Sequence, residues 1–390
     1  MGNMIYDSSV ISVSDATIPG DTGTVVVTFP ARTERQGLHR KGFGQDYLKQ
    51  RGISSLLVKA AWNHWFQVPE AEAAMNAVAD VTARFRRVVT YGSSMGGYGA
   101  ALFSGQLNAA AIIAISPQFS IDRAQVPHER RWATDAARIT FLHDDMARRL
   151  RREATLNLIY DPRTADRSHA EHLLALSDAP CPLLTPFGDH PAGTYLRDSG
   201  LLGHLIFGMI TGEFDAAEAR RQIRARRRHV ASYWSNASVS LFRRHPAIAR
   251  SAAGHAAALA PDNHSVQYQL GRVLAWDGRR AEACDAFRRA TSLLPSSPKY
   301  HLAYGIELLN AGRSLEAEAA LQKAAELAPS DPHPEAARAR ALLALGRLLE
   351  AREAAEEAGR RGLLAHRVTA LLAQIATASS LVSVPDGVNI

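Results

Sequence analysis

The chain has 390 residues, of which 46% are hydrophobic, and a formal net charge of +7. This length and apolar content can fill more than one core, while a total of two cysteines, Cys181 and Cys284, argues against a disulfide framework. No apolar run reaches the about 18 residues that span a bilayer, which disfavours an integral membrane protein.

The first residues of the chain, Met1 to Asp7, have neither the basic leader nor the apolar stretch of a secretory signal. We therefore expect a cytoplasmic protein. The spacing of the Cys and His residues suggests no metal site, and we expect no cofactor.

Short apolar runs rich in β-branched residues alternate with helix-compatible stretches through the first half of the chain. The predicted strands cover residues 23–29, 54–59, 88–91, 111–115, 156–160 and 183–187, and helices are expected over 43–50 and 69–84, for example. This alternation predicts an α/β fold, in which right-handed crossovers build a mostly parallel sheet with helices on both faces.

The third predicted strand runs into Gly92-Ser93-Ser94-Met95-Gly96, which has the pattern GxSxG. On a sharp turn from strand to helix, this pattern lifts a serine hydroxyl out of the sheet. Glycines on either side of Ser94 have no Cβ to collide as the turn tightens. Ser94 is therefore a candidate nucleophile.

Two further polar residues follow later strands of the predicted sheet. Asp161 comes directly after residues 156–160, and His190 follows residues 183–187. Ligands of such sheets bind beyond the carboxyl ends of the strands, where all three side chains are expected. The chain order Ser, Asp, His after three strands resembles the α/β-hydrolase family, over residues 1 to about 215. Asp166 and His169 lie close enough to Asp161 and His190 to serve as substitutes.

The resemblance implies roles that the chemistry of ester cleavage also requires. His190 would take the proton of Ser94 and return it to the leaving group, and Asp161 would orient the imidazole. The backbone N–H of Met95 would be one donor of the oxyanion hole. The second donor would be Ala31 or a neighbour, because Pro30 has no N–H to give.

The segment after the second predicted strand, residues 60–67, is rich in aromatic side chains. Asn63 and Trp65 are candidates for a wall of the substrate pocket, because aromatic faces bind apolar and sugar surfaces while an amide sets orientation. Alternatively, the aromatics pack under a cap and Asn63 caps a turn. Residues 117–150 form an insertion that is either such a cap or a solvated helical excursion.

The second half of the chain repeats with a period of 34 residues. Pro261, Pro295 and Pro329 follow this period, as do Gly278, Gly312 and Gly346 and several alanines. The pattern resembles the tetratricopeptide repeat, in which small residues let two helices pack closely, a glycine breaks the turn and a proline ends the second helix. We expect an all-α tetratricopeptide (TPR) solenoid that binds a protein partner or mediates self-association.

An arginine-rich stretch, residues 216–229, lies between the two halves. Clustered arginines can neutralise phosphates, but no aromatic pattern for base stacking accompanies them, and arginine suits a solvated helix face. We expect no nucleic-acid binding; an acidic partner or an anionic polysaccharide fits better. The expected domains are a hydrolase domain over 1–215, a basic helical linker over 216–236, a repeat array over 237–375 and a tail over 376–390.

The sequence thus favours a serine hydrolase that cleaves a small-molecule or glycan acyl ester through an acyl-enzyme, fused to a TPR module. One alternative is an acyltransferase, in which a sugar or protein hydroxyl replaces water in the second step. Another is a catalytically silent hydrolase-fold scaffold that acts as a protein-binding module.

Overall fold

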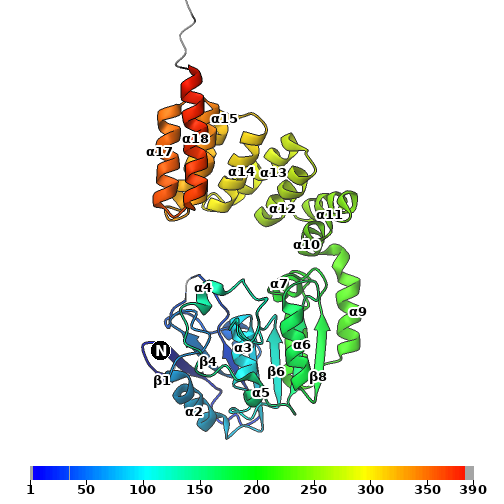
Figure 1. Ribbon diagram of the computed structural model, residues 1–390. Coiled ribbons are helices and arrows are strands. Elements are labelled where there is room, and N and C mark those ends of the chain that lie inside the picture. The colour runs from blue at the N-terminus through cyan, green and yellow to red at the C-terminus, as the bar shows by residue number, and fades with distance from the viewer. Residues whose placement is uncertain (1–2, 35, 383–390) are drawn as a thin grey trace, which may run out of the picture. The chain divides into compact units, whose positions relative to one another are not determined.

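The computed structural model describes residues 3–34 and 36–382, in two compact units that divide after Tyr233. The N-terminal unit is built on one eight-stranded sheet (Figure 1). The strands are β1 (Asn3–Asp7), β2 (Ile11–Ala16), β3 (Thr24–Phe29), β4 (Ser54–Ala60), β5 (Arg87–Ser93), β6 (Ala111–Ile115), β7 (Thr155–Tyr160) and β8 (Pro180–Leu184).

The strand order is β1-β2-β4-β3-β5-β6-β7-β8, and all neighbours from β4 to β8 are parallel. β2 pairs antiparallel with both β1 and β4. The five strands expected from 23–29 to 156–160 are present with ends that differ by at most two residues, and the mostly parallel sheet is confirmed. β1 and β2 were not expected, because Ser12 and Ser14 interrupt the apolar pattern of β2.

The sixth expected strand, 183–187, begins three residues earlier in the structure, as β8. β8 is the edge strand of the sheet, where prolines such as Pro180 and Pro182 are tolerated because one side of the strand needs no N–H donors. Phe187 lies beyond β8 with a φ of 62° and so belongs to the following loop.

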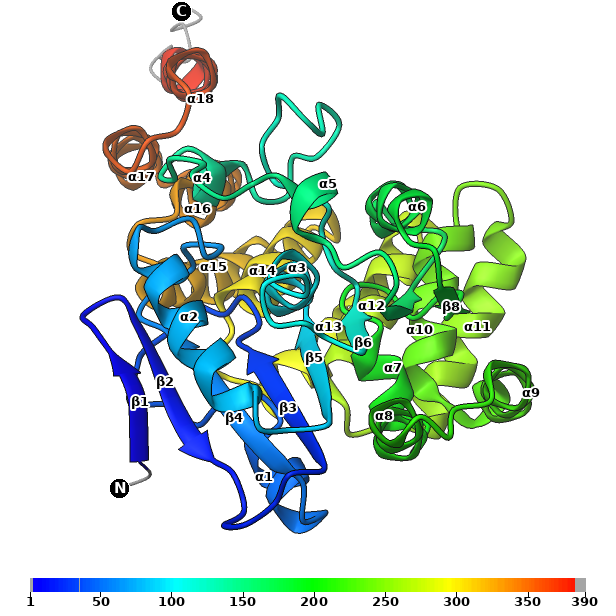
Figure 2. The same cartoon turned by 90° about the horizontal axis from the view of Figure 1, so that it is seen from below.

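Helices cover both faces of the sheet, and each face has its own apolar core. Figure 2 shows α3 and α6 on one side and α1 and α8 on the other. The helices of the unit are α1 (Gln45–Gln50), α2 (Glu70–Thr82), α3 (Met95–Leu102), α4 (Ala133–Ala136), α5 (Met146–Arg149), α6 (Asp166–Leu176), α7 (Gly193–Asp198), α8 (Leu202–Thr211) and α9 (Ala216–Arg226), followed by the short 3-10 helix η1 (Arg227–His229).

Helix α9 belongs to the N-terminal unit. Ala219 and Ile223 are buried in the same core as side chains of α7 and α8. The expected boundary at residue 215 and the separate linker over 216–236 therefore need correction, because the apolar face of this arginine-rich helix packs beside the sheet. Helix α10 (Ala231–Leu241) contains the division between the units.

The C-terminal unit is an all-helical array, as expected from the sequence. Its helices are α11 (Pro246–Leu259), α12 (His264–Trp276), α13 (Arg280–Leu293), α14 (Pro298–Asn310), α15 (Ser314–Leu327), α16 (Pro332–Ala344), α17 (Leu348–Arg360) and α18 (Ala365–Val382). Residues 34 apart, Gly278, Gly312 and Gly346, separate the two helices of successive pairs with φ values of 76°, 77° and 74°. The helical turn at each of these positions needs the left-handed conformation that glycine adopts without strain.

The helices within a pair approach closely where the sequence has small residues. A Cβ on Gly271 would lie 2.7 Å from Phe287 Cδ1, and one on Gly305 would lie 2.5 Å from Leu321 Cγ. The expected tail begins inside α18, which continues the helical array to Val382, and residues 383–390 lie outside the described residues.

Candidate active site

Ser94 lies on a sharp turn between β5 and α3. Its backbone has φ 54° and ψ −120°, a strained conformation for a residue with a side chain. A Cβ on Gly96 would lie 2.3 Å from the Phe29 carbonyl oxygen, and one on Gly92 would lie 2.1 Å from the Gly96 carbonyl carbon. Only glycine fits at these two positions, so the local sequence enforces the turn that presents the Ser94 hydroxyl.

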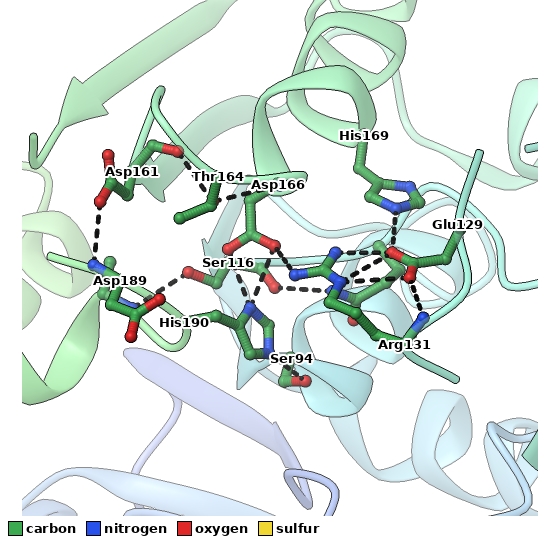
Figure 3. Close-up of polar contacts among 12 residues, drawn as sticks. Ser94, Ser116, Glu129, Arg131, Asp161, Thr164, Asp166, His169, Asp189 and His190 are labelled. Atoms are coloured by element: carbon green, nitrogen blue, oxygen red, sulfur yellow. Dashed lines mark hydrogen bonds and ion pairs between the residues drawn. The ribbon is translucent and has the colours of Figure 1, made fainter. Parts of the chain in front are cut away.

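His190 reaches Ser94 from the loop between β8 and α7. Its Nε2 lies 3.0 Å from Ser94 Oγ, and its side chain is 14% exposed (Figure 3). Ser94 itself is 5% exposed. The imidazole therefore has the position of a base that accepts the proton of a largely buried hydroxyl.

The carboxylate that holds His190 belongs to Asp166, the first residue of α6, and not to Asp161. Asp166 Oδ2 and Oδ1 lie 2.8 and 3.0 Å from His190 Nδ1, and the Asp166 side chain is fully buried. Two hydrogen bonds to one ring nitrogen fix the imidazole so that Nε2 faces Ser94. The structure thus brings Ser94, His190 and Asp166 together, which corrects the expected contact with Asp161.

Asp161 instead shapes the loops around the site. Its Oδ1 accepts a hydrogen bond from the Arg163 N–H at 2.9 Å, and its Oδ2 accepts one from the Asp189 N–H at 3.0 Å. Because Asp161 ends its strand directly, its carboxylate satisfies backbone donors of its own turn and of the loop that carries His190. Asp161 thus stabilises the loop that carries His190.

Arg131 binds the other side of Asp166. Its guanidinium donates to Asp166 Oδ1 at 2.7 Å and to both oxygens of Glu129 at 2.6 to 3.1 Å. Glu129 also binds His169 Nε2 at 2.9 Å, and both of these side chains are buried. His169, considered as a substitute for His190, therefore lies in a separate contact one step from the acid (Figure 3).

These contacts determine the ionisation of the acids. Burial on its own would raise the pKa of Asp166, but the hydrogen bonds and charges of His190 and Arg131 outweigh burial and hold that pKa below its ordinary value. Burial likewise opposes ionisation of Glu129, whose pKa is nevertheless held well below the usual range by His169 and Arg131. At Asp161, burial prevails over the backbone hydrogen bonds and raises the pKa.

The two expected donors of an oxyanion hole lie on adjoining segments. Met95 is the first residue of α3, and Ala31 belongs to the loop after β3, whose Pro30 carbonyl lies 3.0 Å from where a Gly96 Cβ would be. The Ser94 N–H is already used, because it donates to the Ile115 carbonyl at 2.8 Å. A pocket of about 410 Å³ adjoins this loop and is lined by β4, Pro30, Ala31 and residues that follow them.

Asn63 and Trp65, expected at the pocket wall, hold the surroundings of the site together. Asn63 donates to the Thr33 carbonyl at 2.7 Å and accepts from Gln36 Nε2 at 3.0 Å, so it fixes the loop that carries Ala31. Trp65 is fully buried, and its Nε1 donates to Asp135 at 3.1 Å. The structure thus gives Trp65 no exposed face for a ligand, in line with the alternative in which the aromatics pack under a cap.

The insertion between β6 and β7 covers this region as a cap. Trp132 lies with its ring 5.6 Å from the His190 ring, between the guanidinium groups of Arg32 and Arg131 at 5.1 and 5.6 Å. Asp135 forms an ion pair with Arg32 at 2.6 Å, on the loop after β3. The sequence assigned no role to Arg131, because Arg131 and Asp166 are 35 residues apart and no local pattern joins them.

The described residues contain no group of three or more His, Cys, Asp or Glu side chains arranged to hold a metal ion. Within the same part of the chain, no helix has the length and apolar character needed to cross a membrane.

Comparisons with known proteins find likeness only at the level of structure. No protein-family model matches the chain, and no curated protein matches it. Among solved structures, PilF of Pseudomonas aeruginosa is 19% identical, covers 48% of this chain and 83% of its own, and has a TM-score of 0.37. A crystal structure of MamA is 17% identical over 43% of this chain and 90% of its own, with a TM-score of 0.34.

YrrB, described as a TPR protein with an unusual peptide-binding site, is 16% identical over 45% of this chain and 89% of its own, with a TM-score of 0.36. All three matches span less than half of this chain.

Proposed function

We propose that the N-terminal unit is a serine hydrolase that cleaves carboxylic esters through an acyl-enzyme on Ser94. The observation that carries the proposal is His190, which lies within hydrogen-bond distance of Ser94 Oγ through Nε2 and of the Asp166 carboxylate through Nδ1. Nucleophile, base and orienting acid in this arrangement are the requirements for attack on an acyl carbon.

The reaction follows from this arrangement. His190 Nε2 accepts the Ser94 proton as Oγ bonds to the acyl carbon, and the negative charge that forms on the acyl oxygen is stabilised by the N–H of Met95 and a donor near Ala31. The imidazolium, stabilised by Asp166, gives its proton to the leaving alcohol as the ester bond breaks. Water then attacks the acyl-serine by the same route and releases the acid.

The test is labelling of the full chain with a fluorophosphonate probe, which reacts with activated serines. We expect one labelled serine, Ser94, and hydrolysis of short-chain p-nitrophenyl esters. Ser94→Ala should abolish both, whereas Ser93→Ala, a neighbouring hydroxyl at the end of β5, should retain both. A folded wild type that takes no label would contradict the proposal and leave the silent scaffold as the better account of this unit.

Acyl transfer shares the first half of the reaction, so the acyl-enzyme alone does not separate it from hydrolysis. The products distinguish the two reactions when a sugar alcohol is added to the assay with a p-nitrophenyl ester. A new sugar ester in place of free acid would assign the chain as an acyltransferase.

A second candidate function concerns the repeat array, which we propose to be a protein-binding module. A pocket of about 580 Å³ lies on α14, α16 and α18, with apolar side chains such as Leu302 and Leu371 beside His333, Arg340 and Arg367. An apolar floor with cationic groups fits a peptide that carries leucine-like and acidic side chains.

Fluorescence anisotropy with an acidic, leucine-containing peptide tests this second function. We expect binding that weakens at least tenfold in Arg340→Glu/Arg367→Glu and persists in the matched surface variant Arg352→Glu. Sedimentation of the same proteins tests self-association. A dimer that dissociates in the double variant, with no peptide binding, would assign the surface to a second copy of the chain.

A further inference from the structure

A short segment of the cap, residues 129–135, touches three parts of the candidate active site. Arg131 binds the carboxylate of Asp166, and the ring of Trp132 lies against His190. Asp135 binds Arg32 of the loop after β3 through two hydrogen bonds, at 2.6 and 3.2 Å. The acid, the base and the loop beside the oxyanion position are therefore all in contact with one stretch of chain.

The charged groups around Asp166 carry more negative than positive charge. The Phe119 N–H donates to His169 Nδ1 at 3.1 Å, so the proton of a neutral His169 is on Nε2, which faces Glu129. Glu129 and Asp166 together carry one more charge than the single Arg131 guanidinium between them. A proton that His190 accepts from Ser94 during catalysis would neutralise this excess.

Arg131 offsets part of this negative charge and fixes the orientation of the Asp166 carboxylate. One guanidinium nitrogen binds Asp166 Oδ1, while Nε and the other terminal nitrogen bind Glu129, so the fork of the guanidinium is held at both ends. Asp166 is thereby left with the orientation in which Oδ2 faces His190 Nδ1 at 2.8 Å.

We propose that Arg131 is the positioning residue of this active site, which holds the Asp166 carboxylate in the orientation that directs His190 toward Ser94. The proposal rests on the proposed hydrolase function. Arg131 touches no reacting atom and acts through Asp166. The groups that surround the imidazole in this argument are Asp166 of α6, Ser94 of the turn before α3, and Arg131, Trp132 and Glu129 of the cap, with Arg32 on the far side of Trp132.

The test separates the charge of Arg131 from its geometry. Arg131→Met removes both, so we expect kcat to fall about 10- to 100-fold and the acidic limb of the pH profile of kcat/KM to move to higher pH by about 0.5 to 1 unit. The limb moves up because a carboxylate without its guanidinium stabilises the imidazolium more strongly. Arg131→Lys keeps the charge without the fork, so it should lower kcat and leave the limb in place.

Arg130→Met is the matched control, since it removes an exposed neighbouring arginine and should behave as wild type. A loss of folded protein alone would lower the yield without moving the pH limb. If wild type is labelled at Ser94 and Arg131→Met has the wild-type kcat and pH profile, the inference is wrong and the hydrolase function stands. If wild type is not labelled, the hydrolase function itself fails.

A second and independent observation is a basic pocket on α9. It has a volume of about 250 Å³, and its apolar floor includes Leu184, Pro186 and Ile223. Its cationic lining consists of Arg220, Arg224 and Arg227, and its lining residues include no acid. The spacing of four and three residues places the three arginines on one face of the helical stretch.

Several exposed arginines elsewhere in the described residues pair with acids. On the same helix Arg221 pairs with Glu218 at 2.6 Å, and in the repeats Arg279 pairs with Glu282 at 2.6 Å. Arg220 donates to the Pro182 carbonyl at 2.9 Å, on the free edge of β8. Within residues 3–34 and 36–382, no hydrogen bond or ion pair engages the guanidinium groups of Arg224 and Arg227.

Like charges at this spacing repel one another, so the cluster favours an added anion. The volume limits the occupant to a small molecule, the apolar floor favours a hydrocarbon substituent, and guanidinium forks match the oxygens of a phosphate. We infer that this pocket binds a small organic phosphate monoester.

Isothermal titration of the full chain with phenyl phosphate tests this site, and inorganic phosphate and benzoate serve as comparisons. We expect phenyl phosphate to bind more tightly than either, and Arg224→Gln/Arg227→Gln to weaken it at least tenfold. The matched control Arg221→Gln, which removes an arginine that pairs with Glu218 and does not line the pocket, should bind as wild type. The inference would be overturned if the double variant bound phenyl phosphate as tightly as the Arg221→Gln control, or if the wild type gave no heat with phenyl phosphate. Tighter, equally variant-dependent binding of a single-stranded oligonucleotide would assign the cluster to nucleic acid instead.

Discussion

The two units of this chain differ in where their backbones are strained. In the N-terminal unit, several residues with side chains adopt positive φ, among them Ser94 and Ser116 directly after strands and Phe187 and Asp189 in the loop after β8. In the described part of the C-terminal unit, only glycines do so, at the helical turns. A strained backbone persists only where the surrounding packing imposes it. The strained residues of the N-terminal unit therefore indicate that this unit holds particular side chains in fixed positions.

The repeats follow a different rule. Each helical pair is closed by an unstrained glycine turn and by small residues at the helix contact, and the same solution recurs every 34 residues. A change in one repeat therefore alters local packing, whereas a change at the strained edge of the sheet alters chemistry. The following predictions test that distinction, from the largest expected effect to the smallest.

The largest effect should come from the acid. Asp166→Asn should lower kcat by about 10⁴, because an amide neither holds the required tautomer of His190 nor stabilises the imidazolium. Asp161→Asn should lower kcat far less, since Asp161 contacts only backbone donors of the loops. Steady-state hydrolysis of a p-nitrophenyl ester measures both. The opposite ranking would return the role of the acid to Asp161.

Acid should destabilise the N-terminal unit selectively through His64. Burial lowers the pKa of His64 to about 4, although a backbone hydrogen bond with Val10 opposes the shift. The unfolded chain binds a proton near pH 6.5 and the folded chain does not, so stability is lost as pH falls below 6.5 and the loss is complete below pH 4.

Between pH 7 and pH 5 the loss should be about 2 kcal/mol. Urea unfolding followed by hydrogen exchange on peptides from each unit measures it, and the peptides of the repeats serve as the internal control. His64→Gln should remove most of the difference between the two pH values. An unchanged difference in that variant would show that another group carries it.

A methyl group at a helix contact should affect the repeats alone. Gly305→Ala places a Cβ 2.5 Å from Leu321 Cγ, so we expect a loss of about 2 kcal/mol in the C-terminal unit. Gly312→Ala meets no atom within 4 Å but has a φ of 77°, so its loss should be about 1 kcal/mol. Thermal unfolding measures both, and ester hydrolysis at 25 °C should remain at the wild-type rate. A matching loss of activity would show that the units are energetically coupled.

The smallest effect on kcat should come from the loop after β3. Asn63→Ala removes the hydrogen bonds that hold Thr33 and Gln36, and we expect kcat to fall about tenfold as the loop near Ala31 loosens. Asn76→Ala is the matched control, because Asn76 binds Gln106 on the exposed surface. Equal kcat in the two variants would indicate that Asn63 only closes a turn.

The central sheet and the repeats could be predicted from the sequence because their patterns are local. Buried parallel strands such as β6 need continuous apolar runs, and a 34-residue period is visible without any structure. Strand β1 was not predicted because an edge position permits polar and exposed residues, and β2 was not predicted because the buried Ser12 and Ser14 interrupt its apolar pattern.

The candidate site was predictable only in part. Ser94 and His190 were indicated by a motif and by their positions after strands. Asp161 and Asp166 belong to the same short segment, and only the start of α6 decides which carboxylate faces the imidazole. The contact between Arg131 and Asp166 joins residues 35 apart across an irregular cap, and no periodicity encodes such a pair.

The anchorage of the cap has a consequence for engineering. Exchange of a cap for one from another protein of similar fold is a way to change ligand preference, and it assumes that the cap is a detachable part. Here residues 129–135 supply the ion pairs of both Asp166 and Arg32. A transplanted cap would have to reproduce Arg131 and Asp135 at the same two points, so a recombination breakpoint is better placed within residues 137–141, between these ion pairs and the one that His143 forms with Glu72.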